Sequence, residues 1–142
     1  MSFTSFQFSQ EILRAIEDME YHTPTNIQAQ TIPVILEGKD VLGRSHTGTG
    51  KTAAYGLPLV EMLNPTYKMP QTLIICPTRE LVIQVTDELR KFSKYKEGIK
   101  CVPIFGGYPI DYQIKMLKKG CSIIIGTPGR IKDIAFDAAS IN

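Results

Sequence analysis

The chain has 142 residues, of which 43% are hydrophobic and 21% are charged. This length and composition suit one soluble globular fold with a single hydrophobic core. The sequence has no apolar run of about 18 residues and no basic segment followed by an apolar one at its start, which argues against a membrane span and a secretory signal. The net charge of +2 is too small to indicate nucleic-acid binding by itself.

The cysteines give an expectation about the compartment. Cys76, Cys101 and Cys121 are odd in number and lack the spacing of metal ligands. Each borders or begins an apolar run that is typical of a buried strand. Thiols in such positions are ordinary core residues in a reducing environment. We therefore expect inert thiols and a cytoplasmic location.

The first predicted elements are two helices. The first follows Ser9, because apolar residues recur on one face at helical spacing. These residues are Ile12, Leu13, Ile16 and Met19. The second helix is predicted from Thr25 toward Gly38, with a bend or a break near Pro33.

From residue 39 onward, a strand, a turn and a helix alternate along the chain. The predicted strands are 40–44, 72–76, 101–105 and 122–125. The alternation predicts βαβ units and a mostly parallel sheet with helices on both faces. The continuous apolar runs LIIC and IIIG favour strands that are covered on both faces.

The turns that follow these strands are candidates for binding phosphates. In open parallel sheets, ligands bind beyond the carboxyl ends of the strands. Each predicted turn also leads into a helix amino terminus, where free N–H groups and the helix dipole favour anions. The sequence therefore predicts a phosphate-binding surface along one edge of the sheet.

The first turn is a glycine-rich phosphate loop. It reads Ser45-His46-Thr47-Gly48-Thr49-Gly50-Lys51-Thr52. The glycines let the backbone curl so that successive N–H groups point at a phosphate. Lys51 would neutralise the β- and γ-phosphates, and the Thr52 hydroxyl would coordinate Mg²⁺. The turn departs from the strict pattern at Ser45, where glycine is usual.

Upstream, Gln28 is a candidate for recognising adenine. A glutamine amide can donate to and accept from the N6/N7 edge of adenine. Thr25 and Gln28 also have the spacing of a capping box. From the spacing alone, this capping role is favoured over the recognition of adenine. Phe3 could stack on a base, although a lone aromatic is more typical of a core.

The order of these motifs resembles that of the DEAD-box ATP-dependent RNA helicases. Phe3 with 24–28 resembles the Q motif, and 45–52 resembles motif I. Pro77-Thr78-Arg79-Glu80-Leu81 with Gln84 resembles motif Ia, Gly106-Gly107 the GG doublet, and Thr127-Pro128-Gly129-Arg130 motif Ib. The string around PTREL is the most specific of these, and the five motifs in order cover nearly the whole chain.

The resemblance implies a RecA-like P-loop NTPase fold that is incomplete at its carboxyl end. Residues 1–38 would be a Q-motif region, and 39–142 part of the first RecA-like, ATP-binding helicase domain. The implied activity is ATP binding and hydrolysis coupled to RNA unwinding or remodelling, with Mg²⁺. The phosphate-loop residues would bind ATP: Thr47, Gly48, Thr49, Gly50, Lys51 and Thr52. Lys51 and Thr52 would take part in catalysis, while Gln28 would read adenine and Phe3 would stack on it.

By the same resemblance, several residues would follow an RNA backbone. They are Pro77, Thr78, Arg79, Gly107, Thr127, Gly129 and Arg130. Arg79 and Arg130 can each grip a phosphate with a planar fork. None of these residues would read a base edge, so binding would not depend on sequence. An ordinary helix cap at Thr127, followed by Pro128, is compatible with this role.

Some positions depart from the family pattern. Glu20 stands where the Q motif usually has glycine, and Asn26 where proline is common. Ser45 and His46 replace the usual alanine and glutamine of motif I. No Asp-Glu-Ala-Asp string follows motif Ib, and neither the Ser-Ala-Thr motif nor a second RecA-like domain is present. We therefore expect a helicase fragment that is inactive alone; the alternative is a non-catalytic module that binds nucleotide or RNA.

Overall fold

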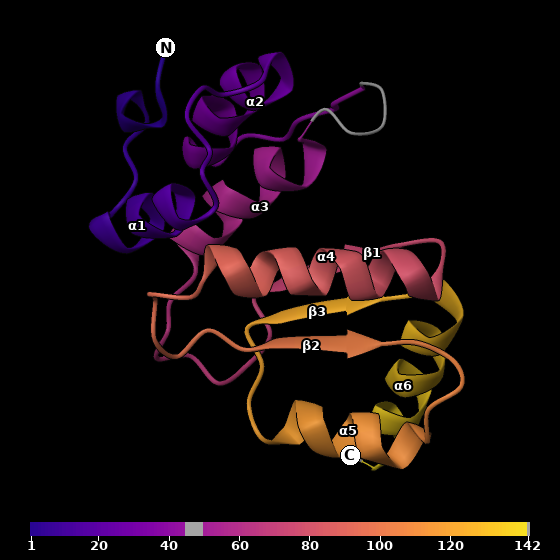
Figure 1. Ribbon diagram of the computed structural model, residues 1–142. Helices are drawn as coiled ribbons and strands as arrows, with labels where there is room; N and C mark the ends of the chain where they lie inside the picture. The colour runs from indigo at the N-terminus through magenta and orange to yellow at the C-terminus, as the bar shows by residue number, and fades with distance from the viewer. Residues whose placement is uncertain (45–49, 142) are drawn as a thin grey trace. The chain divides into compact units, whose positions relative to one another are not determined.

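The computed structural model describes residues 1–44 and 50–141, which form two compact units (Figure 1). The first unit comprises residues 1–63 and 88–97, and the second comprises 64–87 and 98–142. No helix in the described part of the chain is both long and apolar enough to cross a bilayer.

The first unit is helical. Its elements are the short 3₁₀ helix η1 (Phe3–Ser5), α1 (Gln10–Asp18), α2 (Asn26–Leu36) and α3 (Lys51–Met62), joined by the last turns of α4 (Arg79–Phe92). Its core includes Ile12 of α1, Ile32 of α2 and Leu57 of α3, all fully buried. The two predicted amino-terminal helices are therefore confirmed. They begin directly after Ser9 and Thr25.

Pro33 does not break α2, contrary to one of the two outcomes predicted for it. The helix is continuous from Asn26 to Leu36 with Pro33 inside it. A proline removes one backbone hydrogen bond from a helix interior. Here the neighbouring Thr31 and Ile32 are buried, and the Pro33 carbonyl still accepts from the N–H of Glu37 at 3.2 Å. Burial of the turn that precedes the proline, together with the retained hydrogen bond after it, is consistent with an intact helix.

The strand predicted at 40–44 is absent, and this prediction was wrong. These residues have no regular secondary structure, and Leu42 is 98% exposed. A strand exists only when the N–H and C=O groups of a neighbouring strand pair with it. Among the described residues, 40–44 have no such neighbour. Apolar residues alone therefore did not make a strand here.

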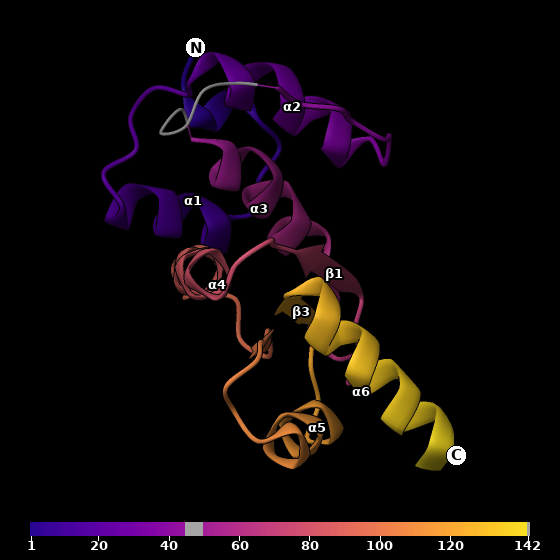
Figure 2. The ribbon, with the colours of Figure 1, turned by 90° about the vertical axis from the view of Figure 1, so that its right-hand side faces the viewer.

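The second unit contains a parallel sheet, as predicted. Its strands are β1 (Thr72–Ile75), β2 (Cys101–Ile104) and β3 (Ile123–Gly126), in the order β1-β3-β2. The helices of this unit are the first turns of α4, then α5 (Ile110–Lys118) and α6 (Pro128–Ile141). Viewed toward the strand ends, α4 lies on one face of the sheet, and α5 and α6 lie on the other (Figure 2).

The strands differ in how completely they are covered. Ile123 and Ile125 of the central β3 are fully buried, as predicted for that apolar run. In β1, however, Leu73 and Ile75 are both more than half exposed. The structure pairs β1 on one side only, with β3, so it is an edge strand among the described residues. The prediction that LIIC is covered on both faces was therefore wrong.

All three cysteines are buried, which agrees with their predicted place in the core. Burial raises the pKa of the Cys76 thiol and, more strongly, raises the pKa of the Cys121 thiol to about 11. The thiolate is the reactive form of cysteine. The thiols of Cys76 and Cys121 are therefore protonated at neutral pH, which agrees with the prediction of inert thiols for these two residues.

Candidate nucleotide and RNA sites

Gln28 connects the start of α2 to the end of the phosphate loop. Its Oε1 accepts from the N–H of Thr25 at 3.0 Å, and the Thr25 hydroxyl accepts from the N–H of Gln28 at 3.4 Å. These two bonds make the predicted capping box. The amide Nε2 also donates to the carbonyl oxygen of Gly50 at 3.2 Å. Sequence analysis did not predict this third bond, because it joins residues from separate segments.

Gly50 is required at this contact. Its φ is +82°, and an added Cβ would overlap the Nε2 of Gln28. A side chain at residue 50 would therefore displace the Gln28 amide. Gln28 itself is only 4% exposed. After its bonds to Thr25 and Gly50, the Gln28 amide has one N–H and one oxygen lone pair that bond to no other described residue. One donor and one acceptor are what the N6/N7 edge of adenine needs.

Phe3 lies in a small aromatic cluster. Its ring is buried, stacks on Tyr21 with centroids 6.1 Å apart, and meets Phe6 edge-on at 6.0 Å. Burial and the nearby Glu88 carboxylate raise the pKa of Tyr21, so its phenol stays neutral. Phe3 is therefore a core residue in this structure, and its stacking on adenine stays a prediction. Tyr21, which sequence reasoning passed over, covers one face of the Phe3 ring.

The phosphate loop is only partly described. The predicted ligands Thr47, Gly48 and Thr49, with Ser45 and His46, lie outside the described residues. Lys51 begins α3 directly after Gly50 and is exposed, and Thr52 follows it, half-buried. Lys51 and Tyr55 line a cavity of about 270 Å³ that also touches α2 and the segment 41–43.

The turns of the second unit gather at one edge of its sheet. Ile75, Ile104 and Gly126 are in register at the carboxyl ends of the three strands. The hydrogen bonds continue beyond the strands, from the N–H of Cys76 to the Gly126 carbonyl and from the N–H of Thr127 to the Ile104 carbonyl, both at 3.0 Å. The segments that follow the strands carry all seven predicted RNA ligands: Pro77, Thr78, Arg79, Gly107, Thr127, Gly129 and Arg130.

Arg79 begins α4 and reaches across to the turn after β2. Its guanidinium carbon lies 5.0 Å from the centroid of Phe105 and 6.0 Å from that of Tyr108. A Cβ added to Gly107 would lie only 3.3 Å from Nη1 of Arg79. Glycine at this position therefore lets the Arg79 guanidinium lie close to the backbone of the turn. Arg79 is exposed and joins no salt bridge with another described residue. Its charge is therefore available to a phosphate.

Arg130 faces a different environment. Its Nη1 donates to the backbone carbonyl of Tyr108 at 2.8 Å and to Oε1 of the buried Gln113 at 3.2 Å. Its Nε lies 3.8 Å from a carboxylate oxygen of Asp133. The side chain is 16% exposed. Arg130 thus fixes the turn after β2, a role that sequence reasoning missed because Gln113 carries no motif.

The remaining predicted ligands are at helix starts. The Thr78 hydroxyl accepts from the N–H of Leu81 at 3.2 Å, which caps α4. The Thr127 carbonyl accepts from the N–H of Ile131 at 3.1 Å. Pro128 is the first residue of α6, as predicted for a helix that Thr127 caps. Pro77 and Gly129 are exposed. Pro77, Thr78, Thr127 and Gly129 thus all lie in the segments that follow the carboxyl ends of the strands.

A model of the DEAD/DEAH box helicase family matches residues 25–141. The chain belongs to this family. It is 50% identical, over 94% of its length, to the DEAD-box ATP-dependent RNA helicase CshA of Bacillus subtilis, and 45% identical, over 93%, to the ATP-dependent RNA helicase DeaD of Escherichia coli. It covers 27% and 21% of those two proteins, so it spans about a quarter of the length of these curated relatives.

Solved structures agree with the family assignment. A DEAD box protein from Methanococcus jannaschii superimposes with a TM-score of 0.88 at 40% identity, covering 94% of this chain and 36% of that one. A second, described as a hypothetical ATP-dependent RNA helicase from Sulfolobus tokodaii, gives 0.82 at 36% identity, covering 92% and 37%. The predicted family and the RecA-like α/β fold of this DEAD-box chain are therefore confirmed.

Proposed function

We propose that this chain supplies half of the ATP site and part of the RNA track of an ATP-dependent RNA helicase. The observation that carries the proposal is the convergence at one sheet edge of the turns bearing Arg79, Gly107 and Thr127. The Gln28–Gly50 hydrogen bond supports a nucleotide site on the first unit. Residues 1–38 act as the Q-motif region, and 39–142 belong to the first helicase domain.

In this proposal, Gln28 selects adenine through its remaining donor and acceptor, and Phe3 stacks on the base. The loop 47–50 wraps the phosphates with backbone N–H groups, and Lys51 neutralises their charge. Mg²⁺, when bound, adds further neutralisation; Thr52 supplies its protein oxygen, a donor that Mg²⁺ accepts alongside phosphates and water. The described residues contain no cluster of three His, Cys, Asp or Glu that could hold a metal.

RNA binding in this proposal is electrostatic and independent of sequence. Arg79 contacts a phosphate directly, and Thr78, Gly107 and Thr127 offer hydroxyl and N–H donors to the same backbone. Arg130 holds the turn after β2 in place and contributes charge at its rim. In-line attack on the γ-phosphate also needs a group that orients the water and a positive charge on the far side of the phosphate. The proposal assigns that positive charge to a second RecA-like domain, the partner of this surface. The burial of all three cysteines supports a cytoplasmic site of action.

The decisive test is a chimaera in which these 142 residues replace the matching segment of the Bacillus subtilis relative. Lys51→Ala should abolish RNA-stimulated ATP turnover and ATP-dependent unwinding of a short duplex. Lys39→Ala is the matched control, because Lys39 is an exposed lysine paired only with Glu37, at 2.9 Å, in the described residues. Near-normal turnover in the Lys51→Ala chimaera would contradict the proposal.

The alternative is a non-catalytic module that binds nucleotide or RNA. It is favoured if the unsubstituted chimaera binds RNA with the expected salt dependence but turns over no ATP. The same assays therefore separate the two functions.

A further inference from the structure

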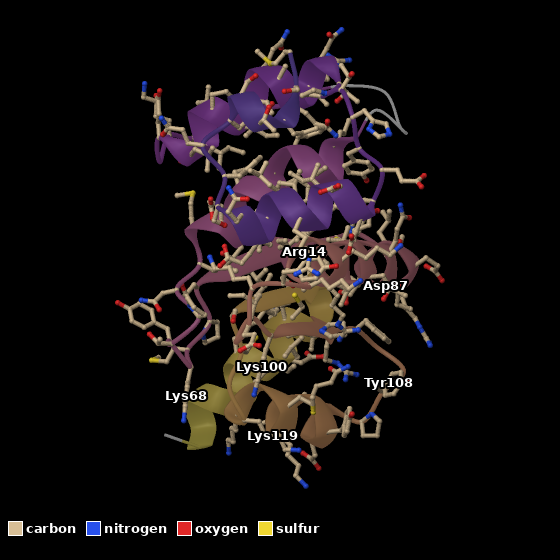
Figure 3. All side chains as sticks on the ribbon, turned by 60° about the vertical axis from the view of Figure 1, so that its left-hand side comes forward. Arg14, Lys68, Asp87, Lys100, Tyr108 and Lys119 are labelled. Carbon is tan, nitrogen blue, oxygen red and sulfur yellow. The ribbon has the colours of Figure 1, made fainter. Side chains whose placement is uncertain are left out.

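Two tyrosines form an exposed stack beside Arg79. Tyr108 lies in the turn after β2, and Tyr112 lies in the first turn of α5. Their ring centroids are 6.5 Å apart with an interplanar angle of 30°. The residues are 48% and 54% exposed. Figure 3 labels Tyr108 on the loop between β2 and α5, where it projects from the body of its unit.

The stack rests on a fixed base. Tyr108 meets the buried ring of Phe105 edge-on, with centroids 5.4 Å apart. The backbone carbonyl of Phe105 accepts from Gln113 at 3.0 Å, and that of Tyr108 accepts from Arg130 at 2.8 Å. These two bonds fix the backbone of the turn, and the contact with Phe105 restrains the Tyr108 ring. A restrained ring loses little conformational entropy when a ligand binds, so the Tyr108 ring, with Tyr112 stacked on it, is prepared for contact with a flat partner.

Their neighbours indicate what that partner is. The guanidinium carbon of Arg79 lies 6.0 Å from the Tyr108 centroid, and Gly107, next to Tyr108 in the chain, exposes its backbone. A positively charged side chain that can bind a phosphate thus lies beside the exposed ring of Tyr108. Proteins that bind single-stranded nucleic acids combine these two features: charge follows the backbone, and aromatic side chains stack on the bases.

An ordinary surface tyrosine looks different. Tyr67 is also exposed, on the segment leading into β1, but no ring or cation contact joins it to another described residue. Single exposed aromatics of this kind are common and need no function. Tyr67 precedes β1 and Tyr108 follows β2, so the two tyrosines lie near opposite ends of the parallel strands. Tyr67 is therefore a matched control.

We propose that Tyr108 and Tyr112 form a stacking platform for an unpaired RNA base. The platform adds base contact to a site whose other ligands bind only the sugar-phosphate backbone. Because every base has a flat face, it strengthens binding to single strands without selecting a sequence. A base inside a duplex is already stacked on both sides, so the platform favours unpaired RNA over duplex RNA. This inference rests on the proposed RNA binding at Arg79.

The test measures binding of the intact chain, expressed from its own gene, to labelled single-stranded RNA of about ten nucleotides, the range of sites that track a single strand. Tyr108→Ala and Tyr112→Ala should each weaken binding by about 5- to 50-fold, the usual effect of removing one stacked base. Tyr108→Phe, which keeps the ring, and Tyr67→Ala should bind like the unsubstituted chain.

A second RNA of the same length, with abasic ribose at every position, separates stacking from loop damage. On this RNA the alanine variants should bind as tightly as the unsubstituted chain, because there is no base to stack. An equal loss on both RNAs would overturn the platform, since it would show that the phosphate ligands had moved. Tyr112 is exposed at the start of α5, so Tyr112→Ala decides the question even if Tyr108→Ala unfolds.

The same titrations distinguish the two proposals. If the unsubstituted chain shows no salt-dependent RNA binding, the proposed function fails and the platform fails with it. If that binding is present and depends on Arg79, but neither alanine substitution weakens it, only the platform is overturned.

Discussion

The side-chain amide of Gln28 donates to the carbonyl oxygen of Gly50, 3.2 Å away, and so joins the cap of α2 to the last glycine of the phosphate loop. The same amide accepts from the N–H of Thr25. One side chain therefore links two backbone segments, at Thr25 and at Gly50. A displacement of this amide would therefore act on the backbone that leads into Lys51.

The first prediction concerns adenine selectivity. In the chimaera, Gln28→Ala should weaken ATP binding more than GTP binding, because the donor and acceptor for the N6/N7 edge are lost. Thr25→Ala is the control: it removes the hydroxyl cap and should lower stability by about 1 kcal/mol while leaving the ATP-to-GTP ratio unchanged. Competition titrations with both nucleotides measure the effect. Equal losses for ATP and GTP would leave Gln28 with only its capping role.

The second prediction separates two arginines that share one sheet edge. Arg79→Ala should weaken single-stranded RNA binding about equally across sequences, and should reduce the slope of log affinity against log salt by about 1. Its thermal melting should stay close to that of the unsubstituted chain, because Arg79 makes ring contacts but no hydrogen bond with another described residue in the structure. A loss limited to one RNA sequence would contradict backbone recognition.

For Arg130→Ala, folding should suffer as well. The substitution removes donors to the Tyr108 carbonyl and to the buried Gln113. An unsatisfied buried polar group costs about 1 to 3 kcal/mol, so urea unfolding should show a loss of that size together with weaker RNA binding. An Arg130→Ala variant of unchanged stability would show that these bonds do not hold the turn.

The third prediction is a stabilising substitution. Glu20 has a φ of +59°, directly after the end of α1, in a conformation where glycine is the usual residue. The N–H of Tyr21 donates to the Ile16 carbonyl at 3.2 Å, so the turn is closed around Glu20. Glu20→Gly should raise the free energy of unfolding by about 0.5 to 1 kcal/mol, because a left-handed backbone strains other L-residues.

A matched substitution gives the opposite sign. Glu17 is exposed within α1, where the backbone is helical. Glu17→Gly should lower the free energy of unfolding by about 0.5 to 1 kcal/mol, since glycine is a poor helix former. Thermal or urea unfolding of the two variants side by side measures both. A destabilised Glu20→Gly variant would refute the strain argument.

The fourth prediction follows from the Cys121 thiol. Burial raises its pKa to about 11 from an ordinary value of 9.0. Only the thiolate reacts with alkylating reagents, so at pH 8 the pKa shift alone should slow labelling of Cys121 about 100-fold. Labelling should rise as the pH approaches 11, and also in urea, where the thiol is exposed. Mass spectrometry after iodoacetamide treatment reads this out; rapid labelling of the folded chain at pH 8 would contradict it.

The sequence by itself determined the features that depend on local chemistry. The Thr25–Gln28 capping box and the start of α6 at Pro128 follow from side chains that lie within four residues of their backbone partners. The parallel sheet follows from the alternation of short apolar runs with amphipathic segments. The order of the five motifs also identified the family through its resemblance to the DEAD-box helicases, and the family model confirms it.

Tertiary structure alone decided the rest, because each remaining feature needs a partner distant in the chain. Residues 40–44 have the composition of a strand but form none, since no described strand pairs with them. Arg130 looked like a free phosphate ligand until folding brought the Tyr108 carbonyl within 2.8 Å of it. Gln28 reaches Gly50, 22 positions along the chain, only after α2 packs beside α3. Hydrogen bonds and ring contacts act over a few ångströms of space, and separation along a sequence does not reveal which residues the fold brings within that range.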